Sequence, residues 1–517
     1  METNKDPNDK IKIQDKVDDI ISCIVEFFRN QGTLDDAIII KEHMAIIIEY
    51  LRRLGAGTSD ASAFMSVDQI ERLLLELRSA QADAGLRALL VRMRNVKAES
   101  GIIAQKKSEY RQKGVRLRIF CRSGSSVMTL AGRVPYERMA LVPSRPADKA
   151  RLREIGTDGY VYPLDEALGL SDLPYKITVG AMLEIAKESA RCDSYEEAER
   201  TLRDRTGLKV NDDTLREVTN TVGAIVFCND AIVAESARKA TDTGSLGLGA
   251  TGRQGALYLE VDAALLPTRQ DGQKGVVYKD NRLGMAFSSD NIYWWKHKQL
   301  NKVLYSILKK EYTCLIGNSN DFNKFIFSLA IRNGYGSYQT TVLISDGATW
   351  IRKMKDSLFP DAQLILNFYH LKKHIINYYM IIYNFNKYIY LEKYNHINNL
   401  FYDSKSDEAI EFLKKNCSKK YIADLDILLE YIDHNINNID YAAYRRSGFC
   451  VGSGAIESST MTVLQRRLRH GAMRWNASSA QAVATLLAKA RSGLWESDVV
   501  KPLFSYYGQQ CPGPGDN

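Results

Sequence analysis

The chain has 517 residues, enough for about three or four structural units, and its 45% apolar and 26% charged residues are ordinary for a globular protein. The net charge of +8 and the pI near 8.8 favour an anionic partner only weakly. The polar N-terminus lacks the apolar core of a secretion signal, and no stretch reaches about 18 uninterrupted apolar residues, so neither secretion nor a membrane partner is expected. The eight cysteines include no CxxC pair, which gives no support to a zinc ribbon or a redox motif and favours reduced thiols in a cytoplasmic protein.

Two different patterns divide the first part of the chain. Apolar residues at helical spacing predict a helical region over residues 1–112, which serves as an interaction or packing module or else binds DNA ends. Residues 113–175 change character, because the runs VRLRIF and MTLAGRV are typical of short strands. They predict a small β module with a turn at Gly124.

A helix-turn-helix is predicted over residues 176–232. One helix ends at Gly207, a second begins near Asp213, and two short helices joined by a glycine-containing turn are typical of this motif. The second helix would enter the major groove, whereas a helical hairpin that binds nothing shows the same pattern. Residues 234–255, rich in Gly, Ser, Thr and Ala, predict a linker. The side chains that would reach DNA are Thr214, Arg216 and Asn220.

Two predicted strands of the next part end in aspartates. Alternating apolar residues predict a strand that ends at Asp262, and a second β-rich run ends at Asp346, before a glycine turn and a helix. Residues 256–375 are therefore expected to form a mixed α/β unit, and residues 376–445 are almost wholly helical in pattern. Strand ends in α/β sheets are where functional groups gather.

Residues 446–497 place a third acid in basic surroundings. Glu457 is expected one turn inside a helix, which makes a salt-bridged surface residue the simple alternative. The inward face of this helix is predicted to hold Met461, Leu464 and Leu468. Residues 498–517 are predicted to be a loose tail. The arginines expected to meet DNA phosphates, which position DNA without reading sequence, are Arg466, Arg467, Arg469 and Arg474.

Asp262, Asp346 and Glu457 together have the chemistry of a two-metal site. Carboxylate oxygens are the ligands that Mg²⁺ prefers. Two such ions about 3.5–4 Å apart can activate a nucleophile and stabilise the leaving oxygen of a phosphodiester. Each acid alone is more often a turn or surface residue, so the set and its basic surroundings, rather than any single member, indicate a site.

Four motifs, in their order and spacing, resemble bacterial insertion-sequence transposases of the DDE type. The likeness is greatest to the ISKra-like and ISLre-like group, which has a helical insertion before the final glutamate. It covers about residues 150–495, and PLDEALGL and the predicted helix-turn-helix also resemble the N-terminal region of that group. The four motifs are VDAALLPTR from Val261, SDGATW from Ser345, NFYH from Asn367 and GSGAIES…QRRL…GAMRW from Gly452.

The resemblance implies an RNase H-like core interrupted by an all-helical insertion. Asp262, Asp346 and Glu457 match the catalytic triad and would hold two Mg²⁺ or Mn²⁺ ions. The implied reaction is cleavage of double-stranded DNA at the element ends by water, followed by joining to target DNA through a 3′-hydroxyl. A homodimer or larger synaptic complex on the bacterial nucleoid is implied in the same way.

Two features depart from the pattern of the group. Asn367 stands where relatives often have Asp, and an amide can hydrogen-bond but brings no charge. Some relatives carry Cys pairs over residues 106–150, where this chain has only Cys121, so a β module without metal is expected. His370 matches the histidine that contacts the scissile phosphate or orients a ligand in the group. The spacing of His370 and His374 could also hold zinc, but neither an HExxH glutamate nor a third ligand accompanies them.

Other functions stay open on the sequence alone. A decayed or domesticated relative would bind DNA without cutting it, and an RNase H-like nuclease would cut without joining. Trp350 and Trp475 could stack on an unpaired base, although tryptophans more often belong to a core.

Overall fold

The computed structural model describes residues 96–154, 159–242, 252–269, 275–297, 302–384, 386–452, 454–469 and 473–508, with a few positions between 40 and 84. The helical region predicted over residues 1–112 thus lies outside the described residues, apart from its last helix α4 (Val96–Gln112) and those few positions. Among the described helices, none is both long and apolar enough to cross a membrane. The chain divides into two compact units: a first unit of Met1–Glu184, Glu199–Asn211 and Tyr507–Gln509, and a second unit of Ile185–Ala198, Asp212–Tyr506 and Gln510–Asn517.

A two-stranded antiparallel sheet, β1 (Leu117–Thr129) and β2 (Gly132–Pro143), lies in the first unit. The predicted turn at Gly124 is wrong, because Gly124 lies inside β1 and is paired with β2. The chain turns after Thr129 instead, whose hydroxyl donates to the Gly132 carbonyl over 3.0 Å. Gly132 has a φ of +112°, a conformation that glycine adopts without strain. The helices beside this hairpin are α5 (Pro146–Glu154), α6 (Pro163–Ala167) and η1 (Pro174–Lys176).

Three helices occupy the region predicted as a helix-turn-helix. Gly207 follows the second of them with a φ of +76°, and its N–H donates to the Arg203 carbonyl over 3.0 Å, as expected of a glycine that ends a helix. The three are α7 (Val179–Arg191), α8 (Tyr195–Thr206) and α9 (Asp212–Asp242).

Helix α9 is much longer than the sequence pattern indicates. It has 31 residues and runs to Asp242, so the linker predicted over residues 234–255 is wrong in its first part, and residues 243–251 lie outside the described ones. The helix continues because Ala234 is fully buried in the core of the second unit. Gly223 allows α19 (Ala477–Arg491) to cross α9 closely, since a Cβ at Gly223 would lie 2.5 Å from the Cβ of Ala482.

We expect Gly223→Ala to destabilise the second unit by about 1–3 kcal/mol, because the added methyl must push two packed helices apart. All five tryptophans lie in this unit, so thermal unfolding followed by tryptophan fluorescence reports on it alone. Gly454→Ala is the matched control, since a Cβ there meets no atom within 4 Å. An equal melting temperature for Gly223→Ala and wild type would contradict the close crossing.

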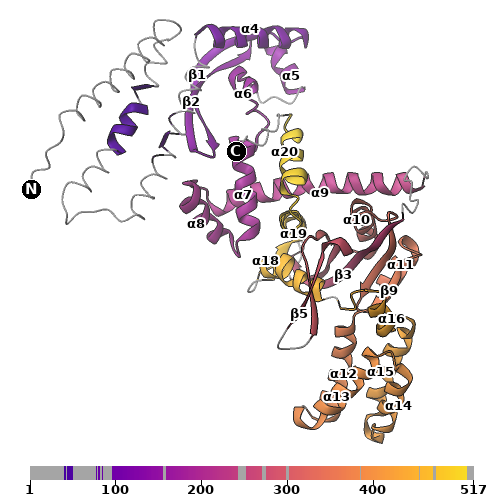
Figure 1. Ribbon diagram of the computed structural model, residues 1–517. Helices are drawn as coiled ribbons and strands as arrows, with labels where there is room; N and C mark the ends of the chain where they lie inside the picture. Colours follow the sequence, from indigo (N-terminus) through magenta and orange to yellow (C-terminus); the bar gives the residue numbers. More distant parts are fainter. Residues whose placement is uncertain are drawn as a thin grey trace, which may run out of the picture. The chain divides into compact units, whose positions relative to one another are not determined.

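Six strands form the main sheet of the second unit, in the order β7-β4-β3-β8-β9, with β10 paired to β3 (Figure 1). Strands β7, β4 and β3 are antiparallel neighbours, whereas β8 and β9 continue the sheet in parallel with β3. The unit is therefore mixed α/β. The strands are β3 (Arg253–Arg269), β4 (Val277–Ser288), β7 (Glu311–Ile316), β8 (Tyr338–Ser345), β9 (Gln363–Leu366) and β10 (Trp475–Asn476).

Strand β3 sends alternate side chains to two faces of the sheet. Leu257 and Leu259 are fully buried in an apolar core with residues of α9, α10 (Ser319–Arg332) and α11 (Thr349–Leu358). On the other face, Tyr258, Glu260 and Asp262 hydrogen-bond to the chain between residues 450 and 460. The prediction that this strand ends at Asp262 is wrong, because β4 stays paired with β3 as far as Thr268.

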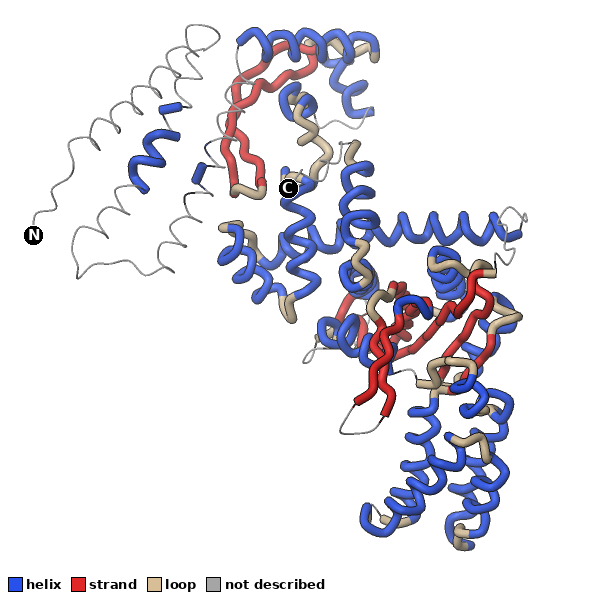
Figure 2. The backbone as a smooth tube through the Cα atoms, in the orientation of Figure 1, coloured by secondary structure: helices blue, strands red, loops and turns tan. Residues whose placement is uncertain are grey.

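A second antiparallel pair, β5 (Ile292–His297) and β6 (Lys302–Ile307), stands apart from the main sheet. Figure 2 shows this hairpin as two strands that extend away from the sheet. The short 3₁₀ helix η2 (Ser289–Asn291) connects it to β4. Residues 298–301, between its strands, lie outside the described residues.

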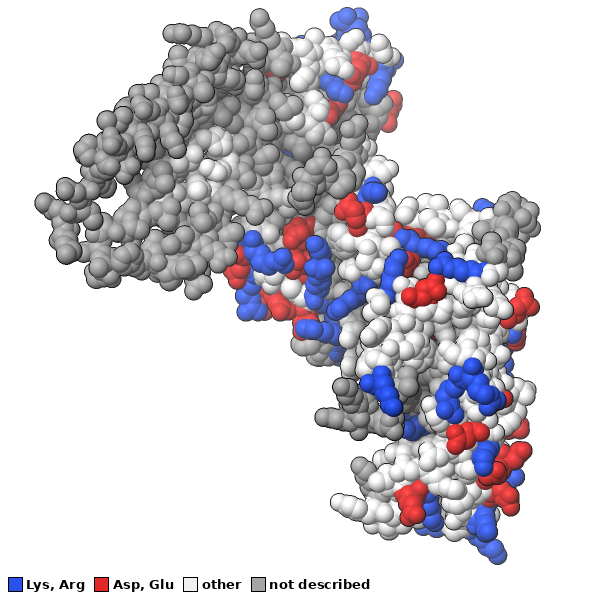
Figure 3. Space-filling view, in the orientation of Figure 1, with Lys and Arg blue, Asp and Glu red and all other residues white. Residues whose placement is uncertain are grey.

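The insertion predicted over residues 376–445 is helical in its described part. On the face drawn in Figure 3, positive and negative side chains of the lower, helical part stand beside one another. The insertion also contains the ion pairs Lys405–Glu408 and Arg445–Asp403. Its helices are α12 (Phe368–Ile382), α13 (Lys387–Tyr402), α14 (Ser406–Lys415), η3 (Lys419–Tyr421), α15 (Ile422–His434), η4 (Ile436–Asn438) and α16 (Tyr441–Arg446).

The helix that carries Glu457 is interrupted. A π-helical segment, η5 (Thr460–Gln465), lies between α17 (Gly454–Ser459) and α18 (Arg466–Leu468). The wider turn changes the direction of the side chains that follow. Leu464 and Leu468 are fully buried as predicted, but the predicted inward position of Met461 is wrong, since its side chain is 64% exposed.

The C-terminal tail predicted over residues 498–517 is wrong in its first part. The segments η6 (Glu496–Val500) and α20 (Lys501–Tyr506) are helical, and Val499 and Leu503 are fully buried. Their spacing of four residues puts both apolar side chains on one helix face. Residues 509–517 lie outside the described ones.

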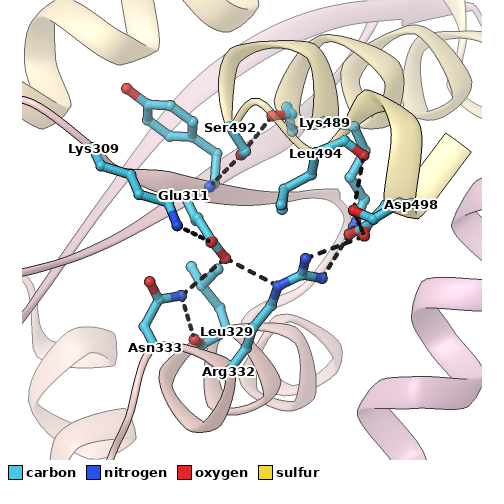
Figure 4. Close-up of polar contacts among 12 residues, drawn as sticks. Lys309, Glu311, Leu329, Arg332, Asn333, Lys489, Ser492, Leu494 and Asp498 are labelled. Carbon is cyan, nitrogen blue, oxygen red and sulfur yellow. Dashed lines mark hydrogen bonds and ion pairs between the residues drawn. The ribbon is translucent and has the colours of Figure 1, made fainter. Parts of the chain in front are cut away.

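A group of ion pairs joins five elements of the second unit, and Figure 4 shows its members Glu311, Arg332, Lys489 and Asp498. The Lys489 ammonium on α19 lies 2.7 Å from Asp230 on α9 and 2.9 Å from Asp498 on η6. Arg332 on α10 bonds Asp498 over 2.7 Å and Glu311 on β7 over 3.1 Å. Each carboxylate therefore has a cation at hydrogen-bond distance, and Lys489 and its two carboxylate partners are largely shielded from water, whereas Arg332 is 42% exposed.

Candidate functional site

Neighbouring elements of the second unit supply three carboxylates from distant parts of the sequence. Asp262 lies on β3, Asp346 follows the adjacent strand β8, and Glu457 lies three residues before Thr460, which bonds Asp262. Burial raises the pKa of Asp262, hydrogen bonds from Thr460 and Ala263 lower it, and the negative charges of Asp346 and Glu457 raise it further. The net effect is a raised pKa. Asp262 is thus an electrostatic neighbour of both other acids.

Asp262 projects from the middle of β3 and is held on both oxygens. The Thr460 hydroxyl on η5 donates to Oδ2 over 2.7 Å, and the Ala263 N–H donates to Oδ1 over 2.9 Å. Thr460 is buried, so this bond ties the segment after Glu457 to the sheet. Thr460 is the first residue of the π-helical segment, so this segment contacts Asp262 directly.

Asp346 follows β8 directly, as predicted. Its Oδ1 accepts the Ala348 N–H over 2.9 Å, and its carbonyl accepts the Tyr431 hydroxyl of the helical insertion over 2.9 Å. Gly347 must be glycine, since its φ is +90° and a Cβ there would lie 3.1 Å from the Asn435 side chain. The insertion thus packs directly against the turn that presents Asp346.

Glu457 is exposed on α17 and is oriented by Asn367. The Asn367 amide nitrogen donates to Glu457 Oε1 over 3.1 Å, and its amide oxygen accepts the Tyr369 N–H over 3.0 Å at the start of α12. The Asn367 backbone N–H also donates to the Ser345 carbonyl over 2.7 Å. Asn367, which is 1% exposed, therefore connects the strand before Asp346 to Glu457.

Glu260 is a site residue that sequence reasoning missed. It is fully buried two positions before Asp262 on the same face of β3, and its Oε2 accepts the Ile456 N–H over 3.1 Å. Burial raises its pKa to about 8, the Ile456 N–H and Lys310 lower it, and Glu457 raises it. The sequence does contain a signal for Glu260: side chains two positions apart in a strand lie on the same face, so Glu260 is expected beside Asp262.

His370 lies on α12 within an aromatic group beside Asp346. Its ring centroid is 5.1 Å from that of His374, which stacks on Tyr431 at 3.9 Å. Burial lowers the pKa of His374, and the positive charges of His370 and Lys373 lower it further. A neutral His374 is therefore favoured near neutral pH.

The predicted DNA-binding arginines separate into exposed and buried ones. Arg469 and Arg474 are exposed, and Arg466 is exposed but bonds Asp193 over 3.0 Å. Arg467 is 3% exposed and donates to the Ser189 and Asp193 carbonyls, so the prediction that it meets phosphates is wrong. The cause is the π-helical segment before it, which turns Arg467 inward.

Both tryptophans considered for base stacking are at least partly buried. Trp475 is buried, donates from its indole nitrogen to the Leu468 carbonyl over 3.0 Å, and thus belongs to the core. Trp350 is partly buried against the core.

Arg216 is exposed on the first turns of α9 and bonds Asp213 over 2.6 Å, while Thr214 is half-buried.

The three carboxylates offer hard oxygen donors of the kind that Mg²⁺ and Mn²⁺ take. Among the described residues, no three His, Cys, Asp or Glu side chains form a ready-made metal site. Such ions usually keep several waters and bind through one or two carboxylates together with substrate phosphates. The donor set therefore fits ions that are held jointly with an anionic substrate.

No family model matches this chain, and the comparison with curated proteins likewise finds no match.

Proposed function

We propose that this protein is a transposase that cleaves DNA at the ends of an insertion sequence and joins them to target DNA. The observation that carries the proposal is that three separate segments supply Asp262, Asp346 and Glu457 to one part of the fold: Asp262 lies on β3, Asp346 follows the neighbouring strand β8, and Thr460, three residues after Glu457, bonds Asp262. Carboxylates that share a site in this way are suited to divalent ions and phosphodiester chemistry.

The sheet supports an RNase H-like core. Three antiparallel strands, β3, β4 and β7, are followed by two strands added in parallel on the other side of β3, which is the strand order of that fold. Asp262 lies on the central strand β3, and Asp346 directly follows the adjacent strand β8. The helical insertion between Asp346 and Glu457 has the position that the resemblance to DDE transposases implies.

The chain's own residues would hold and orient the reacting groups. Two Mg²⁺ or Mn²⁺ ions, when bound, supply activation of the nucleophile and stabilisation of the leaving oxygen. Asp262, Asp346 and Glu457 would hold these ions, and Asn367 and Thr460 keep two of the carboxylates in fixed orientations. His370, whose ring lies 6.5 Å from that of Tyr431, the residue bonded to the Asp346 carbonyl, would contact the scissile phosphate.

Positive side chains on the same unit would position the DNA. Arg466, Arg469 and Arg474 follow Glu457 in the chain and are exposed, so they can meet phosphates. Arg216 and Thr214, at the start of α9, are the candidates for reading base edges if the helix-turn-helix binds DNA.

The test is cleavage and joining of linear DNA that carries the flanking ends of the element, with Mg²⁺ or Mn²⁺. We expect nicked ends and joined products that disappear when EDTA removes the ions. Binding without cleavage would overturn the proposal in favour of a DNA-binding relative that no longer cuts. Cleavage without joined products would favour an RNase H-like nuclease.

Asn367→Ala is expected to lower the affinity for Mn²⁺ by about 10–100-fold, because partners that orient a ligand typically contribute that much. The alanine removes the donor that holds Glu457 Oε1 and leaves the three carboxylates in place. Titration calorimetry or Mn²⁺ electron paramagnetic resonance measures the change without any turnover.

Asn377→Ala serves as the matched control, because Asn377 is exposed on the same helix, α12. Its Mn²⁺ affinity should equal that of wild type. If Asn367→Ala also binds Mn²⁺ as wild type does, Asn367 does not orient a metal ligand.

A further inference from the structure

Exposed aromatic rings lie next to the start of the helix that carries Glu457. Trp294 on β5 is 44% exposed, and Tyr369 at the start of α12 is 58% exposed. Tyr305 on β6 lies opposite Trp294 in the hairpin, with ring centroids 4.9 Å apart. We call Trp294, Tyr305 and Tyr369 the aromatic strip.

Gly452 connects the two halves of the aromatic strip. Its carbonyl accepts the Tyr305 hydroxyl over 3.0 Å, which fixes the hairpin to the chain two residues before α17. On the other side, a Cβ at Gly452 would lie 2.5 Å from the Tyr369 ring. The backbone just before α17 therefore contacts both Tyr305 and Tyr369. Tyr369 also lies two residues after Asn367, which bonds Glu457, so the aromatic strip lies near the Glu457 side of the site.

The charges beside the aromatic strip suit a polyanion. Lys296 is exposed two residues after Trp294, on the same face of β5. The Lys372 ammonium lies 5.8 Å from the centre of the Tyr369 ring, and Lys373 beside it is exposed. Rings flanked by lysines bind single-stranded nucleic acid, since bases stack on the rings and phosphates meet the cations. A purely apolar protein partner would not require these lysines.

We propose that the aromatic strip stacks an unpaired nucleobase of the DNA end, next to the place where ions bound by the three carboxylates would hold the phosphodiester. This inference rests on the proposed function, since it supplies the occupant of the same site. The base must be unpaired, because a base inside a duplex has its faces covered by its neighbours in the stack. A DNA end with a short single-stranded overhang, or with frayed last pairs, meets this requirement.

The test is binding of a duplex that carries a short overhang with 2-aminopurine, compared with the same duplex made blunt. The Asp346→Asn background prevents cleavage during the measurement. We expect the overhang to bind more tightly than the blunt end and the 2-aminopurine fluorescence to be quenched by stacking. Adding Trp294→Ala should weaken binding of the overhang by about tenfold, remove the quenching and leave the blunt duplex unaffected.

Two further variants separate stacking from other causes. Trp295→Ala is the matched control, because Trp295 lies on the same strand but on the opposite face, where it stacks with Tyr293. It should leave affinity and quenching unchanged. Trp294→Leu keeps an apolar side chain without a ring and should behave as Trp294→Ala.

Four results would overturn the inference. The first is that Trp294→Ala binds the blunt and overhang duplexes equally less well, and the second is that it behaves as wild type. The third is that Trp294→Leu binds the overhang with full affinity. The fourth is that Trp294→Ala changes oligomeric state without DNA, which would assign the strip to contact with a second copy of the chain. The proposed function fails separately. If wild type never cleaves DNA but Trp294 still quenches 2-aminopurine, the stacking site is supported and the transposase is not. If wild type cleaves and joins DNA but Trp294→Ala has no effect on overhang binding, the transposase is supported and the stacking site is not.

Discussion

Asp346→Asn is expected to reduce metal-dependent DNA cleavage by about 10³-fold or more. The change removes one negative charge from the group that Asp262 and Glu457 share. Metal ions stabilise transition-state charge by several kcal/mol, and each 1.36 kcal/mol corresponds to about tenfold in rate. Loss of ion binding through one missing carboxylate would therefore remove most of the rate. The measurement is single-turnover cleavage of DNA ends in Mg²⁺ and in Mn²⁺.

The asparagine should leave the fold intact. The contacts that hold residue 346 are made by the Ala348 N–H to Oδ1 and the Tyr431 hydroxyl to the carbonyl, and an asparagine accepts both. We thus expect unchanged DNA affinity and melting temperature together with weaker Mn²⁺ binding. Asp361→Asn, an exposed aspartate in the same unit, is the matched control and should cut as wild type does. Wild-type cleavage by Asp346→Asn would remove Asp346 from the site.

Lys489→Met is expected to destabilise the second unit by about 3–5 kcal/mol, the usual cost of removing one partner of a buried ion pair. Methionine fills a similar volume but leaves Asp230 and Asp498 without the ammonium that lies between them. Arg332 still pairs with Asp498, so Asp498 loses one of its two cations and Asp230 loses the cation that lies 2.7 Å from it. Thermal or urea unfolding followed by tryptophan fluorescence measures the change in this unit.

The deficit should depend on pH in a definite direction. Burial raises the pKa of Asp498, but Lys489, Arg332 and Ser497 lower it more, and the net pKa is lowered. A lowered pKa contributes stability that is present above the unfolded pKa and is lost as the pH falls through the folded one. The difference between wild type and Lys489→Met should thus be largest near neutral pH and narrow on acidification, as the carboxylates become protonated.

Lys405→Met is the control for this prediction. Lys405 pairs with Glu408, but both side chains are more than half exposed, so the pair contributes at most about 1 kcal/mol. Equal effects of Lys405→Met and Lys489→Met would show that the pairs of Lys489 do not hold α9, α19 and η6 together.

Local patterns in the sequence determined the kinds of element and their turns. Gly207 ends α8 and Gly347 forms the turn after Asp346 because both need a positive φ, which glycine adopts without strain. Alternation in β3 and the helical pattern of residues 376–445 follow from backbone periods of two and 3.6, which a sequence displays directly. The three acids could be named for the same reason, since carboxylate chemistry belongs to the side chain itself.

Only the tertiary structure decided where these side chains lie. Asp262 lies in the middle of β3 rather than at its end, because β4 stays paired beyond it. Arg467 is buried and Met461 is exposed, the reverse of what the helical pattern predicts. The reason is the π-helical segment, which Thr460 ties to Asp262 and which changes the direction in which the side chains point. The bonds from Asn367 to Glu457 and from Ile456 to Glu260 join residues far apart in the chain, and no local pattern encodes such partners. A sequence thus determines local conformation through nearby atoms, whereas exposure and the make-up of a site depend on which distant segments pack together.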